Sequence, residues 1–146
     1  ESFDVVVANL VFMMVQSKEE IEQSIREIHR VLKKDGTIMY SLTHPCFVDR
    51  GAHDYRNVFP DGGFYYMKEE YPYKFVLQDA QGKDVDENFY DYHHRLSTYL
   101  NLTVTSGFTI QRVEELSYPD AVVKRHNIPS AYTTFPQSMI VVAKKT

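Results

Sequence analysis

The chain has 146 residues, a length that fits one domain or part of a larger one. Hydrophobic residues make up 43% and charged residues 25%, which is an ordinary composition for a soluble protein. A net charge of −4, with only short clusters of basic residues, argues against a nucleic-acid partner. The single cysteine, Cys46, excludes an internal disulfide and favours a reducing, cytoplasmic location. No apolar run reaches the ~20 residues of a membrane helix, so we expect no membrane partner.

The N-terminal part of the chain has the pattern of a strand, a helix and a second strand. Residues 3–8 form a continuous β-branched run, which predicts a strand that is covered on both faces. Ser17 and Glu20 have capping-box spacing, and apolar residues then recur at helical intervals. Gly36 is placed to end this helix in the left-handed conformation, and residues 37–43 form the next strand. Such a unit predicts two parallel strands of an α/β sheet.

The middle of the chain is rich in aromatic residues. Twelve of the 20 Phe and Tyr residues fall between positions 47 and 92. We expect a packed subdomain or the wall of a pocket there, with residues 64–67 and 73–77 paired as an antiparallel ribbon. The rest of the chain alternates helices and strands: a helix over 95–106, a strand over 108–113, a short helix over 119–125 and a last strand over 138–143.

Polar residues follow both of the predicted parallel strands. Asn9 follows the first strand and His44 the second. In open α/β sheets, ligands bind beyond the carboxyl ends of the parallel strands, so we expect both side chains to face one crevice. Each also has a structural alternative, because Asn9 could cap the next segment and His44, held extended by Pro45, could be a turn residue.

Four motifs, in this order, resemble the class I S-adenosylmethionine-dependent methyltransferases of the small-molecule type (methyltransferase type 11-like). They are FDVVVANLVFMMV at residues 3–15, RVLKKDG at 30–36, HRLSTYLNLTVTSGFTIQRVEEL at 94–116 and the apolar strand at 139–143. The resemblance implies that residues 1–146 are the C-terminal, substrate-side half of one methyltransferase domain. It implies an α/β fold, a partial Rossmann-like sheet with family strands 4-5-7-6. The last strand would be antiparallel, and an aromatic-rich antiparallel insertion would occupy about 47–92.

The same resemblance implies S-adenosylmethionine as the cofactor of the full-length protein. That family binds the cofactor with a Gly-rich turn after its first strand and an acidic residue at the end of its second. The six glycines of this sequence form no G-x-G-x-x-G. We therefore expect a fragment that is inactive alone.

Several residues match positions with known roles in the family. The motif beside the cofactor's methionine and sulfonium corresponds to Asn9, Leu10 and Val11. Residues that would face the substrate are His44, Pro45, His94 and Arg95, to which we add Tyr90 from the aromatic segment. His44 and then His94 are the predicted general bases, because histidine titrates near neutral pH. No Cys or carboxylate lies at ligand spacing from His94, so we predict no metal site.

The predicted function is methyl transfer to a small molecule. The alternative is a non-catalytic α/β module for assembly or binding. In that case the open edge of the strand at residues 3–8 would pair with another chain, for example in a homodimer. A fragment of an α/β oxidoreductase is a weaker alternative, since the sequence has an antiparallel ending and no nicotinamide-binding turn.

Overall fold

The computed structural model describes residues 2–146, except for the side chains of residues 86–88. The strands are β1 (Phe3–Asn9), β2 (Leu32–Thr43), β3 (Tyr55–Val58), β4 (Tyr71–Gln78), β5 (Asp84–His93), β6 (Phe108–Leu116) and β7 (Ser138–Lys145). The helices are α1 (Lys18–Val31), α2 (Leu96–Thr105) and α3 (Asp120–His126), with 3-10 turns η1 (Phe12–Met14), η2 (Val48–Arg50) and η3 (Ser130–Thr133). Within the described part of the chain, no helix is long and apolar enough to cross a membrane.

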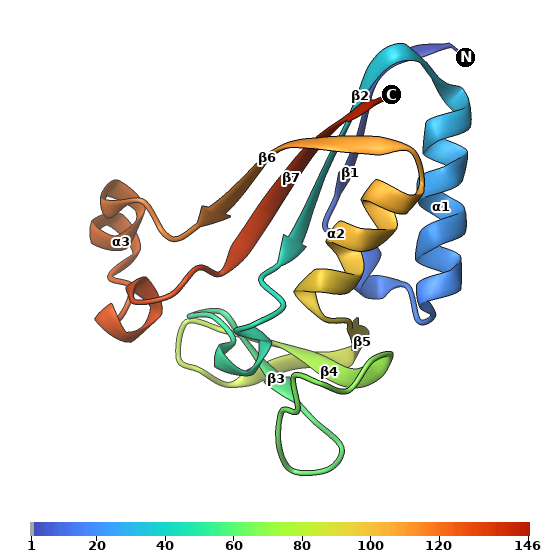
Figure 1. Cartoon of the computed structure of the whole chain (residues 1–146). Coiled ribbons are helices and arrows are strands. Elements are labelled where there is room, and N and C mark those ends of the chain that lie inside the picture. Colours follow the sequence, from blue (N-terminus) through green and yellow to red (C-terminus); the bar gives the residue numbers. More distant parts are fainter. Residues whose placement is uncertain (1) are drawn as a thin grey trace.

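The strands form two separate sheets. One has four strands in the order β1-β2-β7-β6, and the other is antiparallel with the order β3-β4-β5. Figure 1 shows the three-stranded sheet beyond one end of the larger sheet, with α1 and α2 next to each other. The predicted α/β fold with an aromatic-rich antiparallel insertion is confirmed.

The first three elements form the predicted parallel unit. β1 and β2 are parallel, with α1 between them in sequence. The hydroxyl of Ser17 accepts a hydrogen bond from the Glu20 N–H, and the Glu20 carboxylate accepts one from the Ser17 N–H. β7 is antiparallel to both of its neighbours, β2 and β6. The order and direction of the four strands are those that the resemblance implied.

The end of α1 differs from the prediction. The helix ends at Val31, and β2 begins at the next residue. Asp35, and not Gly36, has a left-handed backbone, with a φ of 63°. A Cβ at Gly36 would lie 2.9 Å from the carbonyl oxygen of Lys33. Gly36 is therefore required for space and not for its backbone conformation.

The pairing within the aromatic segment was also predicted wrongly. Residues 64–67 form no strand, and β4 pairs with β3 and β5 instead. The ring centroids of Phe64 and Tyr66 lie 4.9 and 5.5 Å from that of His93. Side-chain packing, rather than a strand ladder, fixes this short segment.

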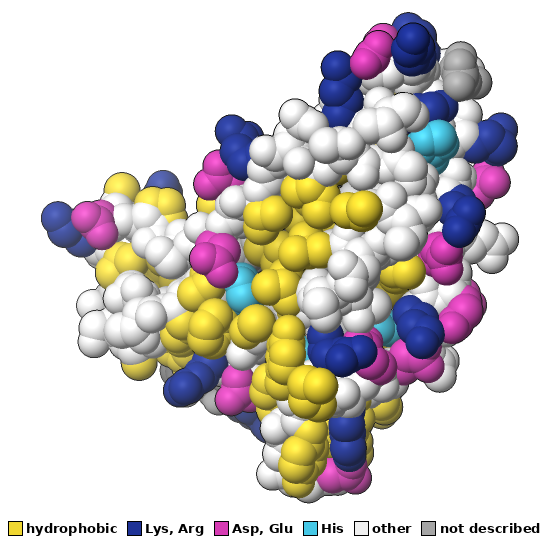
Figure 2. All heavy atoms as spheres, viewed as in Figure 1, with side chains coloured by type: hydrophobic (Ala, Val, Ile, Leu, Met, Phe, Trp, Pro, Cys, Tyr) yellow, Lys and Arg dark blue, Asp and Glu magenta, His cyan; other side chains and the backbone are white. Residues whose placement is uncertain are grey.

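The main core lies between the four-stranded sheet and the two longer helices. Its fully buried members include Ile21, Ile25, Ile38, Leu42, Val141 and Ala143. The hydroxyl groups of Tyr40 and Thr103 are 2.9 Å apart, which satisfies two polar groups inside this core. Charged side chains lie along the outer side of α1, as Figure 2 shows.

β1 is covered on one face only, contrary to the prediction. Val6 and Ala8 pack against the core, whereas Phe3, Val5 and Val7 are 55%, 54% and 62% exposed. Successive side chains of a strand point to opposite faces, so these three residues share one face of the sheet. Within the described residues, that face of β1 has no covering layer.

Candidate functional site

A pocket of about 870 Å³ lies where β1 and β2 reach their carboxyl ends. Leu10, Met13 and Met14 follow β1, and Thr43 is the last residue of β2. The opposite wall comes from the three-stranded sheet and from the segment after β6. The volume is that of a small-molecule site, at the edge of the sheet where one was predicted.

The chain turns sharply where it leaves β1. Leu10 has a φ of 53°, and its N–H donates to both the carbonyl oxygen and the hydroxyl oxygen of Ser41, at 3.1 and 3.0 Å. The Ser41 hydroxyl donates in turn to Oδ1 of Asn9 at 2.5 Å. Asn9 therefore fixes the turn, and Leu10 lines the pocket. Val11 borders a second pocket, of about 830 Å³, beside α1.

His44 is held by partners on both sides of its ring. Its Nδ1 accepts a hydrogen bond from the Cys46 N–H at 3.3 Å, and its Nε2 is 2.8 Å from Oε1 of Glu115. The ring is buried and lies 5.0 Å from that of Phe47. Asn9 bonds to β2 while His44 reaches to β6, so the structure does not bring these two predicted residues together. The role of His44 as a base stays a prediction.

His94 also lies in a buried network and does not line the large pocket. Its Nε2 donates to the carbonyl oxygen of Val15 at 3.1 Å, and its Nδ1 is 3.4 Å from Oε2 of Glu69. Arg95 donates to Oε1 of Glu69, and so does the hydroxyl of Thr98 at 2.5 Å. Burial raises the pKa of Glu69, but these hydrogen bonds outweigh it and the pKa is lowered overall.

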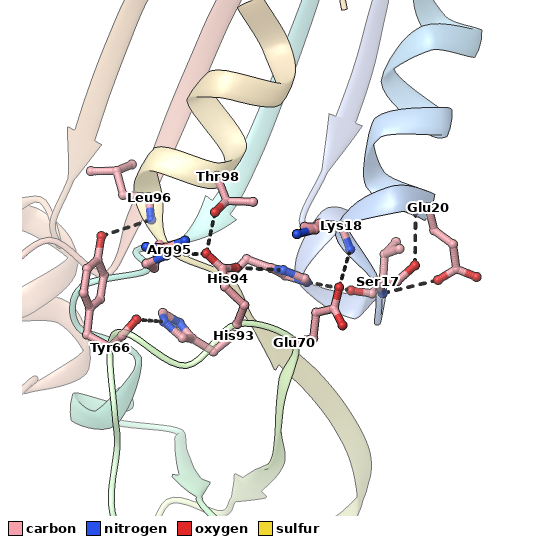
Figure 3. Close-up of polar contacts among 12 residues, drawn as sticks. Ser17, Lys18, Glu20, Tyr66, Glu70, His93, His94, Arg95, Leu96 and Thr98 are labelled. Carbon is pink, nitrogen blue, oxygen red and sulfur yellow. Dashed lines mark hydrogen bonds and ion pairs between the residues drawn. The ribbon is translucent and has the colours of Figure 1, made fainter. Parts of the chain in front are cut away.

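Glu69 and Glu70, which precede β4, together bind the two longer helices. Figure 3 shows Glu70 beside Lys18 at the start of α1. Glu69 binds the first turn of α2 through Thr98, and Glu70 accepts a hydrogen bond from the Lys18 N–H at the start of α1, at 3.1 Å. Carboxylates are favoured at both places, because a helix N-terminus has free N–H groups and a positive dipole end. Pro45 lines only a narrow gap of about 10 Å³ near these contacts.

Tyr90 and Asp91 bring the aromatic strand β5 into the large pocket. Tyr90, a predicted substrate residue, is 51% exposed there. Asp91 was missed by the sequence reasoning and is only 7% exposed. Burial raises its pKa from 3.8 to about 6, although a hydrogen bond with Tyr73 acts in the opposite direction. The signal that could have revealed it is a single acidic residue inside the run Phe89-Tyr90-Asp91-Tyr92.

The described side chains form no cluster of metal ligands. Across the residues whose side chains are described, no group of three or more His, Cys, Asp or Glu could hold a metal ion. The prediction of a metal-free site stays a prediction.

The strand order, the antiparallel β7 and the pocket at the strand ends define a Rossmann-like sheet of the methyltransferase type. Residues 1–40 match a family described as a methyltransferase domain. The sequence matches no curated protein. Beyond residue 40, the chain is similar to known proteins through its fold.

Three solved structures illustrate the similarity. A putative S-adenosylmethionine-dependent methyltransferase from Listeria monocytogenes is 21% identical with a TM-score of 0.68, and the match covers 99% of this chain and 62% of that one. An S-adenosylmethionine-dependent methyltransferase from Mesorhizobium loti is 21% identical with a TM-score of 0.62 and the same coverage. One from Clostridium acetobutylicum is 12% identical with a TM-score of 0.63, over 99% of this chain and 58% of that one. The chain thus has the fold of these methyltransferases and spans about three fifths of their length.

Proposed function

We propose that this chain is a fragment of an S-adenosylmethionine-dependent methyltransferase and supplies the side that binds a small-molecule acceptor. The observation that carries the proposal is the pocket of about 870 Å³ between the turn after β1 and the aromatic sheet. An acceptor in this pocket would lie against Leu10, which belongs to the motif Asn9-Leu10-Val11 that the resemblance places beside the cofactor's methionine and sulfonium.

The residues after β1 fit the positively charged end of the cofactor. S-adenosylmethionine, when bound, supplies a methyl group on a sulfonium. Leu10, Met13 and Met14 offer apolar and polarisable surface there, and Tyr90 and Tyr118 are among the residues that line the same pocket. The sequence has no Gly-rich turn for the rest of the cofactor. We assign those contacts to a part of the protein outside residues 1–146, so this chain alone is inactive.

The chain's own contribution is to place the acceptor. Methyl transfer to a nucleophilic atom depends chiefly on alignment with the methyl group, which a largely apolar pocket that holds the acceptor provides. The hydrogen bonds of Ser41 hold the turn at Leu10, and the three-stranded sheet supplies the facing wall. We place the protein in the cytoplasm, since the one cysteine of these 146 residues, Cys46, is free.

Calorimetry with S-adenosylhomocysteine tests this proposal. We expect micromolar binding by the product of the complete reading frame and weak or no binding by residues 1–146. Failure of the complete protein to bind would overturn the proposal. Tight binding by residues 1–146 would overturn the division of the site between this chain and a separate cofactor-binding part.

The second candidate is a non-catalytic assembly module. The exposed Phe3, Val5 and Val7 of β1 favour it, because open apolar strands pair readily with other chains. Analytical ultracentrifugation of residues 1–146 discriminates the two. A concentration-dependent dimer that a Val7→Lys substitution disrupts would support assembly through β1, whereas a strict monomer would exclude it.

A further inference from the structure

The large pocket has one charged group in an otherwise uncharged lining. Of the described residues that line it, Asp91 is the only one with a formal charge, and the others are apolar, aromatic or neutral polar. An anionic ligand would meet a carboxylate and no basic side chain there. The lining therefore selects for a neutral or cationic ligand.

Asp91 has no countercharge of its own. It is 7% exposed, its partner is the neutral phenol of Tyr73, and no Lys, Arg or His of the described residues forms an ion pair with it. A buried carboxylate without a cation is costly. Burial raises its pKa to about 6, which leaves it ionised at neutral pH and ready to gain from a cation.

Aromatic rings surround the approach to this carboxylate. Tyr55 and Phe75 lie with ring centroids 4.5 Å apart, and both line the pocket together with Phe89 and Tyr118. Phe75, Phe89 and Asp91 share one face of the three-stranded sheet. Ring faces attract cations and also pack against flat or apolar groups. A ligand with an apolar body and one ammonium group can pack against the rings and pair with the carboxylate at the same time.

We infer that this pocket binds an apolar amine, such as an arylalkylamine, whose amino group hydrogen bonds to the carboxylate of Asp91. This inference rests on the proposed function, because the amine is a methyl acceptor only if the cofactor's methyl group lies beside the turn after β1. Asp91 takes one proton from the ammonium group, becoming a neutral carboxylic acid, and leaves the nitrogen with a free electron pair. Asp91 is thus an acceptor-binding residue that also holds the released proton.

Fluorescence anisotropy of tryptamine tests the inference on the chain of 146 residues. The protein has no Trp, so excitation beyond the absorption of tyrosine reports only the ligand. We expect saturable binding of tryptamine, and binding of indole-3-propionate at least about tenfold weaker, because a charge-assisted hydrogen bond is replaced by repulsion.

Three variants make the test specific. Asp91→Asn should weaken tryptamine binding by about tenfold or more and should not weaken indole-3-propionate binding. Phe89→Ala should weaken binding of tryptamine several-fold through loss of a ring on the same face of β5 as Asp91. Asp49→Asn, which removes an exposed carboxylate outside the pocket, should leave binding unchanged. Circular dichroism establishes that each variant is folded.

Equal affinity of wild type and Asp91→Asn for tryptamine would overturn the inference, and so would equal affinity for the two ligands or no saturable binding by the folded wild type. The outcome is separable from the calorimetry with S-adenosylhomocysteine. If the complete protein binds the cofactor but the pocket does not prefer amines, only the inference of an amine ligand is refuted. If the pocket prefers amines but the complete protein does not bind the cofactor, the amine site stands and the proposed methyltransferase function is refuted.

Discussion

Replacing Asp91 by asparagine should stabilise the folded protein above about pH 6 and change little in acid. The pKa of this carboxyl is 3.8 before folding and about 6 in the folded protein. A carboxyl with a raised folded pKa contributes stability that is complete below the unfolded pKa and is lost as the pH rises through the folded pKa. At 1.36 kcal/mol for each pKa unit, the ionised side chain costs up to about 3 kcal/mol near neutral pH.

Urea unfolding followed by circular dichroism measures this difference. Asparagine has nearly the same shape, keeps an oxygen that can accept from the Tyr73 hydroxyl, and carries no charge. We expect Asp91→Asn to exceed wild type by about 3 kcal/mol at about pH 8 and by less than 1 kcal/mol at about pH 4. Asp49→Asn, at an exposed site, should show no such pH-dependent gain. An Asp91→Asn variant that is less stable than wild type at about pH 8 would refute the reasoning.

Substitutions at three other positions test the fold. Glu69→Gln should lower the free energy of unfolding by about 1–3 kcal/mol through loss of the charged bond from Arg95, in chemical denaturation at neutral pH. Because the folded pKa of Glu69 is lowered, this loss should shrink as the pH falls through that pKa. Gly107→Ala should cost about 1 kcal/mol or more in the same assay, since Gly107 has a φ of 91° and a Cβ there would lie 2.9 Å from Nε2 of His29. Ser17→Ala should lower stability by about 0.5–2 kcal/mol by removing the cap of α1, whereas Ser17→Asp should restore it. An unchanged midpoint in Glu69→Gln, Gly107→Ala or Ser17→Ala would contradict the contact assigned to that residue.

The parts of the fold that could be predicted depend on local signals. The capping box at Ser17 and the apolar stripe of α1 involve residues one or two turns apart, and the β-branched run of β1 is a continuous segment. Such patterns are complete within a short window of sequence. Local hydrophobic patterns do not give the order of strands in a sheet. That order was predicted from the resemblance of the four motifs, in their order along the chain, to the methyltransferases.

The parts that could not be predicted depend on partners far away in the sequence. β4 pairs with β3, which has one aromatic residue among its four, whereas residues 64–67, which have three, form no strand. Aromatic content therefore pointed to the wrong segment. The partner of His44 is Glu115, 71 residues along the chain. The sequence around His44 therefore could not show that its ring already has a hydrogen-bond partner. The sequence showed that His44 follows the end of a strand, but it did not show which way the side chain points.

Asp91 is another residue whose surroundings could not be predicted from the neighbouring sequence. Its burial and its raised pKa arise from the way that the three-stranded sheet closes over the end of the four-stranded one. In sequence it is one acidic residue among several near β5. Tyr90 next to it was predicted to contact the substrate, and it does line the pocket. A lining residue of the pocket was therefore named from the sequence, while Asp91, its charged residue, was not; the contact of Tyr90 with a substrate stays a prediction.

Hydrogen–deuterium exchange on the product of the complete reading frame tests the central claim most directly. The claim is that residues 9–14, held by Ser41 at the end of β1, lie against the methyl-donor end of the cofactor. Saturation with S-adenosylhomocysteine should slow exchange in residues 9–14 and leave the exposed helix α3 unchanged. Cofactor binding that leaves exchange in residues 9–14 unaltered would contradict the account.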